Sequence, residues 1–276
     1  MHERSVLVTG AARGIGRATC ESLARAGWEV FAGVRNLSAL EPFEATGITV
    51  VELDVTDSAT IAAAVERASE RRSLDCLVNN AGYAVFGAIE EADLDEARAM
   101  FETNFFGALA VTQAVLPGMR GSGGGVVVNV SSIAARVTAP LFGIYYASKY
   151  ALRSVSEALA MEGAPHGIRV AMIEPGMVDT GFSQAVRRAG PASEGHGPYG
   201  ELAAELVAGF RRWRERLNTD PHEVAAAIVA AAEGDGAFHV PVGHDSRELA
   251  QMRADSDDEQ TLRRVGEYLG LESLRP

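Results

Sequence analysis

The sequence predicts an α/β fold in which a doubly wound, seven-stranded parallel sheet is flanked by helices on both faces. Short runs rich in β-branched residues alternate with segments of helical composition along most of the chain. The run VVVNV at 126–130 lacks polar alternation, which is typical of a strand covered on both faces. A glycine-rich turn separates the first such run from the first helical segment. We therefore expect residues 1–276 to form a single domain with a sizeable core.

Each predicted element follows from local composition. The strands are expected at residues 5–9, 29–34, 49–53, 74–79, 126–130, 169–174 and 238–242. Helical composition extends over 15–26 and 58–71, and an apolar stripe predicts one long helix over 94–116. A further helix begins at Asp220, which fits an N-cap, with Pro221 in its first turn and Glu223 as a capping-box acid.

Two segments depart from this alternation. Residues 181–216 contain several glycines and prolines, and we expect a mobile excursion there with a helix at its end. The tail at 244–276 is charged and contains DSDDE at 255–259, which indicates a solvated helix or partial disorder.

The bulk composition excludes several classes of function. The net charge of -12 argues against general binding of nucleic acid or of an anionic membrane surface. No uncharged apolar run is long enough to span a membrane, and MHERSVLVTG lacks the apolar core of a signal peptide, so we expect a cytoplasmic protein. Cys20 and Cys76 are interpreted as small buried hydrophobes. The histidines show no metal-ligand spacing, and no metal site is assigned.

A phosphate-binding turn is predicted at the start of the first helix. VLVTGAARGIGRA places Gly10, Gly14 and Gly16 after the first strand. Glycines allow a sharp turn and bring backbone N–H groups close to a pyrophosphate, which the helix dipole favours. A glycine-rich turn alone is a weak signal and can be purely structural. Its position between a strand and a helix makes the dinucleotide-binding interpretation the stronger one.

The end of the second strand bears on which dinucleotide is bound. An acid at this corner suits a free ribose 2′-hydroxyl, whereas arginine suits a 2′-phosphate. VFAGVRN offers Arg35 and no acid, and Arg13 in the glycine turn could supply a second guanidinium. We therefore expect NADP(H) in preference to NAD(H). The alternative is that both arginines are merely solvated.

Two polar features inside apolar helical patterns point to chemistry. Asn104 lies on the apolar stripe of the helix predicted at 94–116, and a buried amide needs hydrogen-bond partners. Lys149 is the only lysine, since every other member of the 25 lysine-plus-arginine residues is arginine. Tyr145 lies four residues before it on the same helical face, and Tyr146, three residues before it, is a rival by spacing alone.

Taken together, the motifs resemble those of the short-chain dehydrogenases/reductases, in their compact single-domain branch with a Rossmann-type fold. The matching motifs occur in the family's order and spacing, and the resemblance is strong over residues 5–180 and loose beyond. They are TGAARGIG at 9–16, LDV at 53–55, NNAG at 79–82, Asn104, Ser132, YYASK at 145–149 and PGMVDT at 175–180.

The resemblance implies a catalytic set of four residues. Tyr145 is the implied general acid or base, selected over Tyr146 by the family pattern YxxxK, and Ser132 hydrogen-bonds the substrate oxygen, with Ser131 as its nearest competitor. Lys149 is expected to hold the nicotinamide ribose and to lower the phenol pKa, because an ammonium about 5 Å away stabilises phenolate by about 3 kcal/mol. Asn104 resembles the residue that fixes a water in a proton relay.

The resemblance also implies the residues that contact the cofactor. Asp54 and Val55 border the adenine, Asn80, Ala81 and Gly82 pass the adenosine side, and the PGMVDT loop lies beside the nicotinamide, with Thr180 at the carboxamide. Asn79 instead ties neighbouring strands together. The full expected set is Gly10, Arg13, Gly14, Ile15, Gly16, Arg35, Asp54, Val55, Asn80, Ala81, Gly82, Tyr145, Lys149, Pro175, Gly176, Val178 and Thr180.

The implied function is an NADP(H)-dependent oxidoreductase that interconverts a ketone or aldehyde and an alcohol. The alternatives are an NAD-dependent alcohol or hydroxysteroid-type dehydrogenase and a nicotinamide-sensing regulatory protein without turnover. A sugar-nucleotide epimerase is disfavoured, because too few residues follow Thr180 for its substrate domain. Residues 181–216 would form a substrate lid, whose aromatic residues Phe182, Tyr199, Phe210 and Trp213 suit a lipophilic substrate or simply pack the lid. A homodimer or homotetramer is expected.

Overall fold

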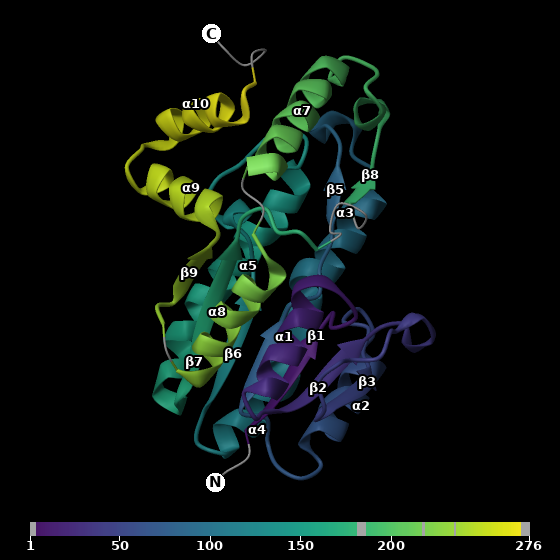
Figure 1. The fold of residues 1–276 in the computed structure, drawn as a ribbon, viewed down its shortest axis with the longest axis vertical. Helices are drawn as coiled ribbons and strands as arrows, with labels where there is room; N and C mark the ends of the chain where they lie inside the picture. The colour runs from purple at the N-terminus through teal and green to yellow at the C-terminus, as the bar shows by residue number, and fades with distance from the viewer. Residues whose placement is uncertain (1–3, 181–185, 217–218, 235, 272–276) are drawn as a thin grey trace.

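A computed structural model describes residues 4–180, 186–216, 219–234 and 236–271, and its centre is one parallel sheet. The strand order is β3-β2-β1-β4-β6-β7-β9, and every pairing in this sheet is parallel (Figure 1). The predicted α/β fold with seven strands is therefore confirmed. The strands are β1 Ser5–Thr9, β2 Glu29–Val34, β3 Ile48–Glu52, β4 Cys76–Asn79, β6 Gly125–Val130, β7 Ile168–Pro175 and β9 His239–Val242.

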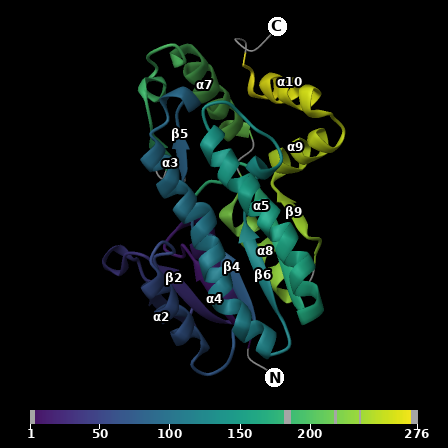
Figure 2. The same ribbon diagram turned by 180° about the vertical axis from the view of Figure 1, so that it is seen from behind.

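Helices cover both faces of the sheet, as Figures 1 and 2 show. Alternate residues of each strand point to opposite faces, so Val6 and Val8 of β1 join one core cluster and Leu7 joins the other. Helices α1 (Gly14–Arg25) and α8 (Pro221–Glu233) pack on the first face. Helices α2 (Ser58–Ser69), α4 (Ala108–Gly121) and α5 (Gly143–Gly163) pack on the second. Cys20 and Cys76 are free and buried in these clusters, as predicted.

The helix predicted over 94–116 is not continuous. It consists of α3 (Leu94–Phe101), a π-helical turn at Glu102–Gly107, and α4, which runs past Pro117. Asn104 lies in this wider turn and is 1% exposed, as its place on the apolar stripe predicts. Helix α4 continues past the proline because Val115 and Met119 on either side of it are both buried in the second core cluster.

The predicted tail is helical at residues 244–269, which was one of the two expected states, but its helices are packed against the rest of the chain rather than merely solvated. This segment forms α9 (His244–Ala254) and α10 (Asp258–Leu269), drawn in yellow in Figure 1. Their apolar residues Leu249, Met252 and Val265 are buried in a third core cluster with Leu206. The charged residues of both helices other than Asp245 lie on their outer faces, so the density of charge along the chain gave no sign of this packing. Asp257 of DSDDE is the N-cap of a capping box that starts α10.

The segment predicted to interrupt the alternation of strands and helices, which follows β7, ends in a helix, as predicted. Strand β8 (Val186–Arg188) pairs in parallel with β5 (Ala84–Phe86), and α7 (Gly200–Arg216) follows. Phe182 lies outside the described residues, so its predicted role in this segment stays a prediction. Among the described helices, none is both long and apolar enough to cross a lipid bilayer.

Candidate active site

The glycine turn between β1 and α1 is packed against two other predicted cofactor segments. Gly10 and Gly14 have φ values of 66° and 56°, in the left-handed region that favours glycine. A Cβ atom on Gly10 would lie 2.9 Å from Ala81 Cα, and one on Gly14 would lie 2.9 Å from Thr180 Cβ. The structure thus brings TGAARGIG, NNAG and PGMVDT together at the carboxyl ends of the strands, where parallel sheets bind ligands.

Thr9, the first residue of TGAARGIG, supports this site although it is not among the predicted site residues. Its Oγ1 accepts the N–H groups of Asn80 at 2.9 Å and Ala81 at 3.0 Å. Asn80 Nδ2 in turn donates to the carbonyl oxygens of Thr9 and Gly10. The sequence signal for Thr9 is its place as the polar last residue of the strand SVLVT. Asn79, by contrast, bonds Asn129 Oδ1 at 2.9 Å and so ties β4 to β6, as predicted.

The two arginines expected at the adenosine end are both exposed. Arg13 precedes α1 without a side-chain cap bond, and Arg35 follows the last residue of β2. Neither guanidinium forms an ion pair or hydrogen bond with another described residue. Both guanidinium groups are therefore available to an anion from outside the protein.

Asp54 and Val55 lie just beyond the end of β3, but only one of them faces inward. Asp54 Oδ1 accepts the N–H of Thr56 at 2.9 Å and its hydroxyl at 2.7 Å, so the carboxylate closes a turn. Val55 is 7% exposed, and the missing side chain of Gly107 gives it room. These contacts anchor the π-helical turn to the edge of the expected adenine site.

Asn104 has the hydrogen-bond partners that its burial requires. Its Oδ1 accepts the Tyr83 N–H at 3.0 Å, and its Nδ2 donates to the Tyr83 carbonyl at 2.9 Å and to Ser148 Oγ at 3.1 Å. The amide thus joins the segment after NNAG to the helix that carries Tyr145 and Lys149. Its role in fixing a water stays a prediction.

Tyr145, Ser132 and Lys149 meet at the start of α5. Ser132 and Tyr145 share a side-chain hydrogen bond, and Lys149 Nζ lies 5.9 Å from the Tyr145 ring centre. Ser132 Oγ also accepts the Ala134 N–H at 3.1 Å. The hydroxyl of Ser131 is instead buried without a hydrogen-bond partner among the described residues. This geometry favours Ser132 over Ser131 as the residue beside the phenol.

The electrostatics of this group differ from the prediction. Burial raises the pKa of Tyr145 to about 12, although the hydrogen bond from Ser132 acts in the opposite direction. Burial also lowers the pKa of Lys149 to about 8. Desolvation of the phenolate is thus the largest influence on the Tyr145 pKa, and the Lys149 ammonium donates a hydrogen bond to Val130 O at 3.2 Å.

A buried ion pair supports the Ser132 loop, and the motif reading did not identify it. Glu174 on β7 has no exposed surface and bonds Arg136 Nε at 2.7 Å and His239 Nδ1 at 3.0 Å. Arg136 follows the short 3-10 turn Ile133–Ala135 that begins at Ser132. The signal in the sequence was a glutamate inside the apolar strand RVAMIEP.

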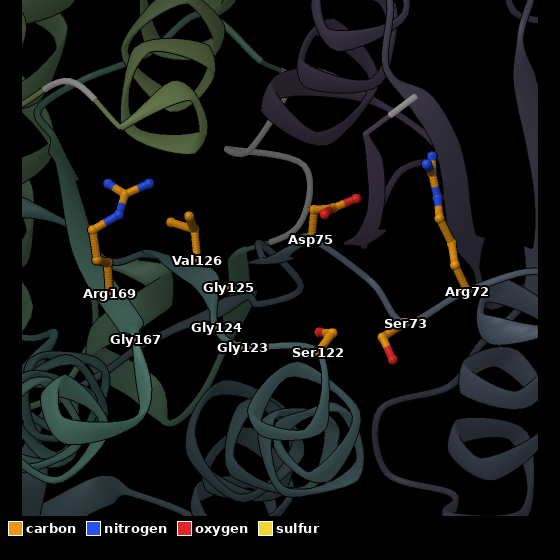
Figure 3. A pocket seen from close by; sticks show the side chains of 10 residues that line it. All are labelled: Arg72, Ser73, Asp75, Ser122, Gly123, Gly124, Gly125, Val126, Gly167 and Arg169. Atoms are coloured by element: carbon orange, nitrogen blue, oxygen red, sulfur yellow. The ribbon is translucent and has the colours of Figure 1, made fainter. Parts of the chain in front are cut away.

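A separate hollow of about 460 Å³ lies at the amino ends of β4, β6 and β7 and includes Arg72, Asp75 and Arg169. Figure 3 shows Arg72 and Arg169 on opposite sides of it. The candidate active site is at the carboxyl ends of the same strands, so this hollow is a different place. Among the described residues, no group of histidine, cysteine or acidic side chains could hold a metal ion.

Comparisons with known proteins all lead to one family. A family model described as short chain dehydrogenase matches residues 4–190. A 3-ketodihydrosphingosine reductase of Bacteroides thetaiotaomicron is 39% identical over 248 residues, which cover 88% of this chain and 89% of that protein. A short-chain dehydrogenase structure from Streptomyces avermitilis aligns with a TM-score of 0.81 at 33% identity, covering 99% of this chain and 98% of that one. One from Burkholderia cenocepacia, in complex with NADP, aligns with a TM-score of 0.76 at 32% identity over the same shares.

Proposed function

This chain belongs to the short-chain dehydrogenase/reductase family, oxidoreductases acting on CH–OH and C=O groups, and from that premise we propose that it reduces a lipophilic ketone with NADPH. The observation that carries the proposal is the meeting of Ser132, Tyr145 and Lys149 beside the glycine turn. The residues present fit a nicotinamide dinucleotide, because a glycine turn with positive φ values at Gly10 and Gly14 begins α1 and the PGMVDT loop lies against it.

The bound cofactor supplies a hydride, and the protein supplies position and a proton. Ser132 hydrogen-bonds the substrate oxygen and places it beside the Tyr145 hydroxyl. Because the pKa of Tyr145 is about 12, the phenol is protonated at neutral pH and can donate its proton to the oxygen as that atom gains negative charge. Lys149 stabilises the phenolate left behind and bonds the ribose. Asn104 holds a water behind Lys149 through which the proton is replaced.

The preference for NADP(H) is supported by charge. Arg13 and Arg35 are exposed at the adenosine end and have no ion-pair partner among the described residues. Arginine forms bidentate contacts with phosphate, which only NADP(H) carries at the ribose 2′ position. A structural relative also binds NADP. The remaining residues of the expected cofactor set contact the adenine, the pyrophosphate and the nicotinamide as the family resemblance implies.

A lipophilic substrate is supported by the aromatic surroundings of Tyr145. Phe142 lies 6.4 Å from the Tyr145 ring, and Phe210 of α7 lies 5.8 Å from Phe142. The row continues through Trp213 to Tyr268 of α10, with centroid distances of 6.1 Å and 4.4 Å. A continuous row of aromatic rings thus begins beside the phenol. The relative named 3-ketodihydrosphingosine reductase has a name that indicates the same class of substrate, a ketone on a long apolar chain.

We propose that residues 181–216 form the substrate lid of this single domain. Arg187 of β8 donates two hydrogen bonds of 2.9 Å to Glu96, and its guanidinium lies 4.5 Å from the Tyr83 ring centre. These contacts hold the described part of the lid beside the segment that follows NNAG.

The assembly and the location of the protein are also proposals. Phe106 and Tyr150, on the helical segments that carry Asn104 and Lys149, are 48% and 40% exposed, and these exposed aromatic side chains support a homodimer or homotetramer. A chain with net charge -12 and no membrane-spanning helix among its described residues is consistent with a cytoplasmic enzyme.

The test is turnover by the purified chain with a series of ketones that differ only in the length of their apolar chain. We expect NADPH consumption. The kcat/KM should rise about fourfold for each added methylene that is buried, until the apolar chain covers the row of aromatic rings. NADH should be a poorer cofactor. NADPH binding without consumption of any ketone would favour the sensing alternative, and equal use of NADH would favour the NAD-dependent one.

A further inference from the structure

A buried carboxylate from the C-terminal segment holds the loop expected beside the nicotinamide. Asp245, near the start of α9, is 1% exposed. Its Oδ2 accepts the Met177 N–H at 2.7 Å, across 68 positions of sequence. Its Oδ1 accepts the Ser246 N–H at 2.8 Å. Figure 1 shows α9 starting at the end of β9, beside the carboxyl edge of the sheet.

The neighbouring contacts make this attachment tight. A Cβ atom on Gly176 would overlap the Asp245 carboxylate, so only glycine lets the acid approach the peptide that joins Gly176 to Met177. Ser246 Oγ donates to the Glu174 carbonyl at 2.6 Å. Two consecutive side chains of α9 therefore bind the main chain on both sides of Pro175.

The loop held in this way reaches the glycine turn. Thr180, at its far end, is the residue that a Cβ on Gly14 would meet at 2.9 Å. Between Met177 and Thr180, Val178 forms an isolated β-bridge with Thr219. The Thr219 N–H also donates to Met177 O at 3.1 Å. A shift of the peptide joining Gly176 to Met177 would therefore move Thr180 relative to the turn.

No positively charged side chain among the described residues forms an ion pair with the buried Asp245 carboxylate. Among the described residues it accepts hydrogen bonds only from main-chain N–H groups, and burial raises its pKa. Removing a carboxylate from water is unfavourable, and the amino end of α9 with two N–H groups offsets only part of that cost. Because burial of this carboxylate is unfavourable and its hydrogen bond fixes a loop of the site, we interpret Asp245 as a residue that positions that loop.

We propose that Asp245 is a positioning residue for the cofactor, which fixes the peptide joining Gly176 to Met177 so that the loop 175–180 is preorganised for the nicotinamide half. This inference rests on the proposed function. It assigns part of the cofactor site to the C-terminal helices, outside the segment in which the family motifs lie.

The test is Asp245→Asn in the full chain. Asparagine keeps the volume but offers one acceptor oxygen where two N–H groups need one each, so one bond is lost. We expect the Kd of NADPH, measured by its fluorescence, and the KM of NADPH to rise about tenfold. The kcat at saturating NADPH should stay within about threefold of wild type, since the catalytic residues are untouched. Gly176→Ala displaces the carboxylate from the other side and should raise the Kd in the same way.

The matched control is Leu249→Ala, on the same helix but in the third core cluster and away from the loop. It should lower Tm and leave the Kd of NADPH within about twofold of wild type. An Asp245→Asn Kd within twofold of wild type, or a Leu249→Ala Kd raised as much as that of Asp245→Asn, would overturn the positioning role. If wild-type protein binds neither NADPH nor NADH, the proposed function fails, and this inference fails with it.

Discussion

Lys149 Nζ lies 5.9 Å from the centre of the Tyr145 ring, one turn along α5, and its hydrogen bond goes to the Val130 carbonyl at 3.2 Å. An ammonium that is only 6% exposed is a costly group in a chain that otherwise uses arginine for its positive charges. Lysine is compact enough to be enclosed beside a phenol, and its pKa shifts readily on burial, whereas a guanidinium is broader and stays charged.

Replacing Tyr145 by phenylalanine should abolish most turnover. The ring and its aromatic contacts remain, but the proton donor is lost, so kcat should fall about 10²–10⁴-fold while the Kd of NADPH changes by less than about twofold. Steady-state assays should show almost no NADPH oxidation, and titration of NADPH fluorescence should give a Kd close to that of wild type. Tyr146→Phe is the matched control and should retain wild-type kcat. A Tyr145→Phe enzyme with wild-type kcat would refute the proton-donor role.

Replacing Lys149 by methionine should stabilise the protein while inactivating it. The pKa of Lys149 is lowered from 10.5 to about 8 by burial, so at neutral pH the folded state carries a penalty of about 3 kcal/mol for the charge. Methionine fills a similar volume without that penalty but also without the bond to Val130. We therefore expect the free energy of unfolding at pH 7 to rise by about 1–3 kcal/mol.

The pH dependence of that difference follows from the direction of the shift. Below pH 8 the lysine is protonated in both states, and the penalty is complete. Between pH 8 and 10.5 the unfolded chain binds a proton that the folded chain releases, so wild-type stability rises relative to Lys149→Met. Urea unfolding of both proteins across this range should show the gap closing. A gap that is constant with pH would contradict the buried-charge account.

Replacing Arg35 by alanine should change cofactor preference rather than catalysis. Loss of a phosphate contact should lower kcat/KM for NADPH about 10–100-fold and leave kcat/KM for NADH within about twofold. Steady-state kinetics with both cofactors and one ketone decide this. Arg25→Ala, which removes an exposed arginine at the far end of α1, is the control and should change neither value. An equal loss with both cofactors would show that Arg35 has no role at a 2′-phosphate.

Replacing Glu174 by glutamine should destabilise the fold. The substitution leaves the Arg136 guanidinium, 18% exposed, without the carboxylate 2.7 Å from its Nε. Breaking a buried pair from one side costs about 3–5 kcal/mol in the free energy of unfolding. Urea unfolding should also show that Glu174→Gln combined with Arg136→Met recovers most of this loss. If the double variant is no more stable than the single one, the loss does not arise from the uncompensated charge.

Much of the fold was predictable because its signals are local. A strand covered on both faces is apolar without alternation, as VVVNV shows, and a helix opening after a glycine turn is readable from adjacent residues. The pairing of Tyr145 with Lys149 needs only the periodicity of one helix. The strands, the glycine turn and the pairing of Tyr145 with Lys149 could therefore be predicted from local sequence, whereas the expected roles of Ser132 and Asn104 follow from the family resemblance.

Other features depend on contacts between segments that are distant in sequence. The π-helical turn at Glu102–Gly107 interrupts a helix whose apolar stripe already predicts a buried Asn104, and the charged tail folds because Leu249 and Val265 pack in one cluster with Leu206 of α7. The pKa values of Tyr145 and Lys149 depend on how completely the fold removes water from them, and the contact between Asp245 and Met177 exists because β9 ends beside β7. Burial and long-range proximity are properties of the assembled sheet, and no local pattern records them.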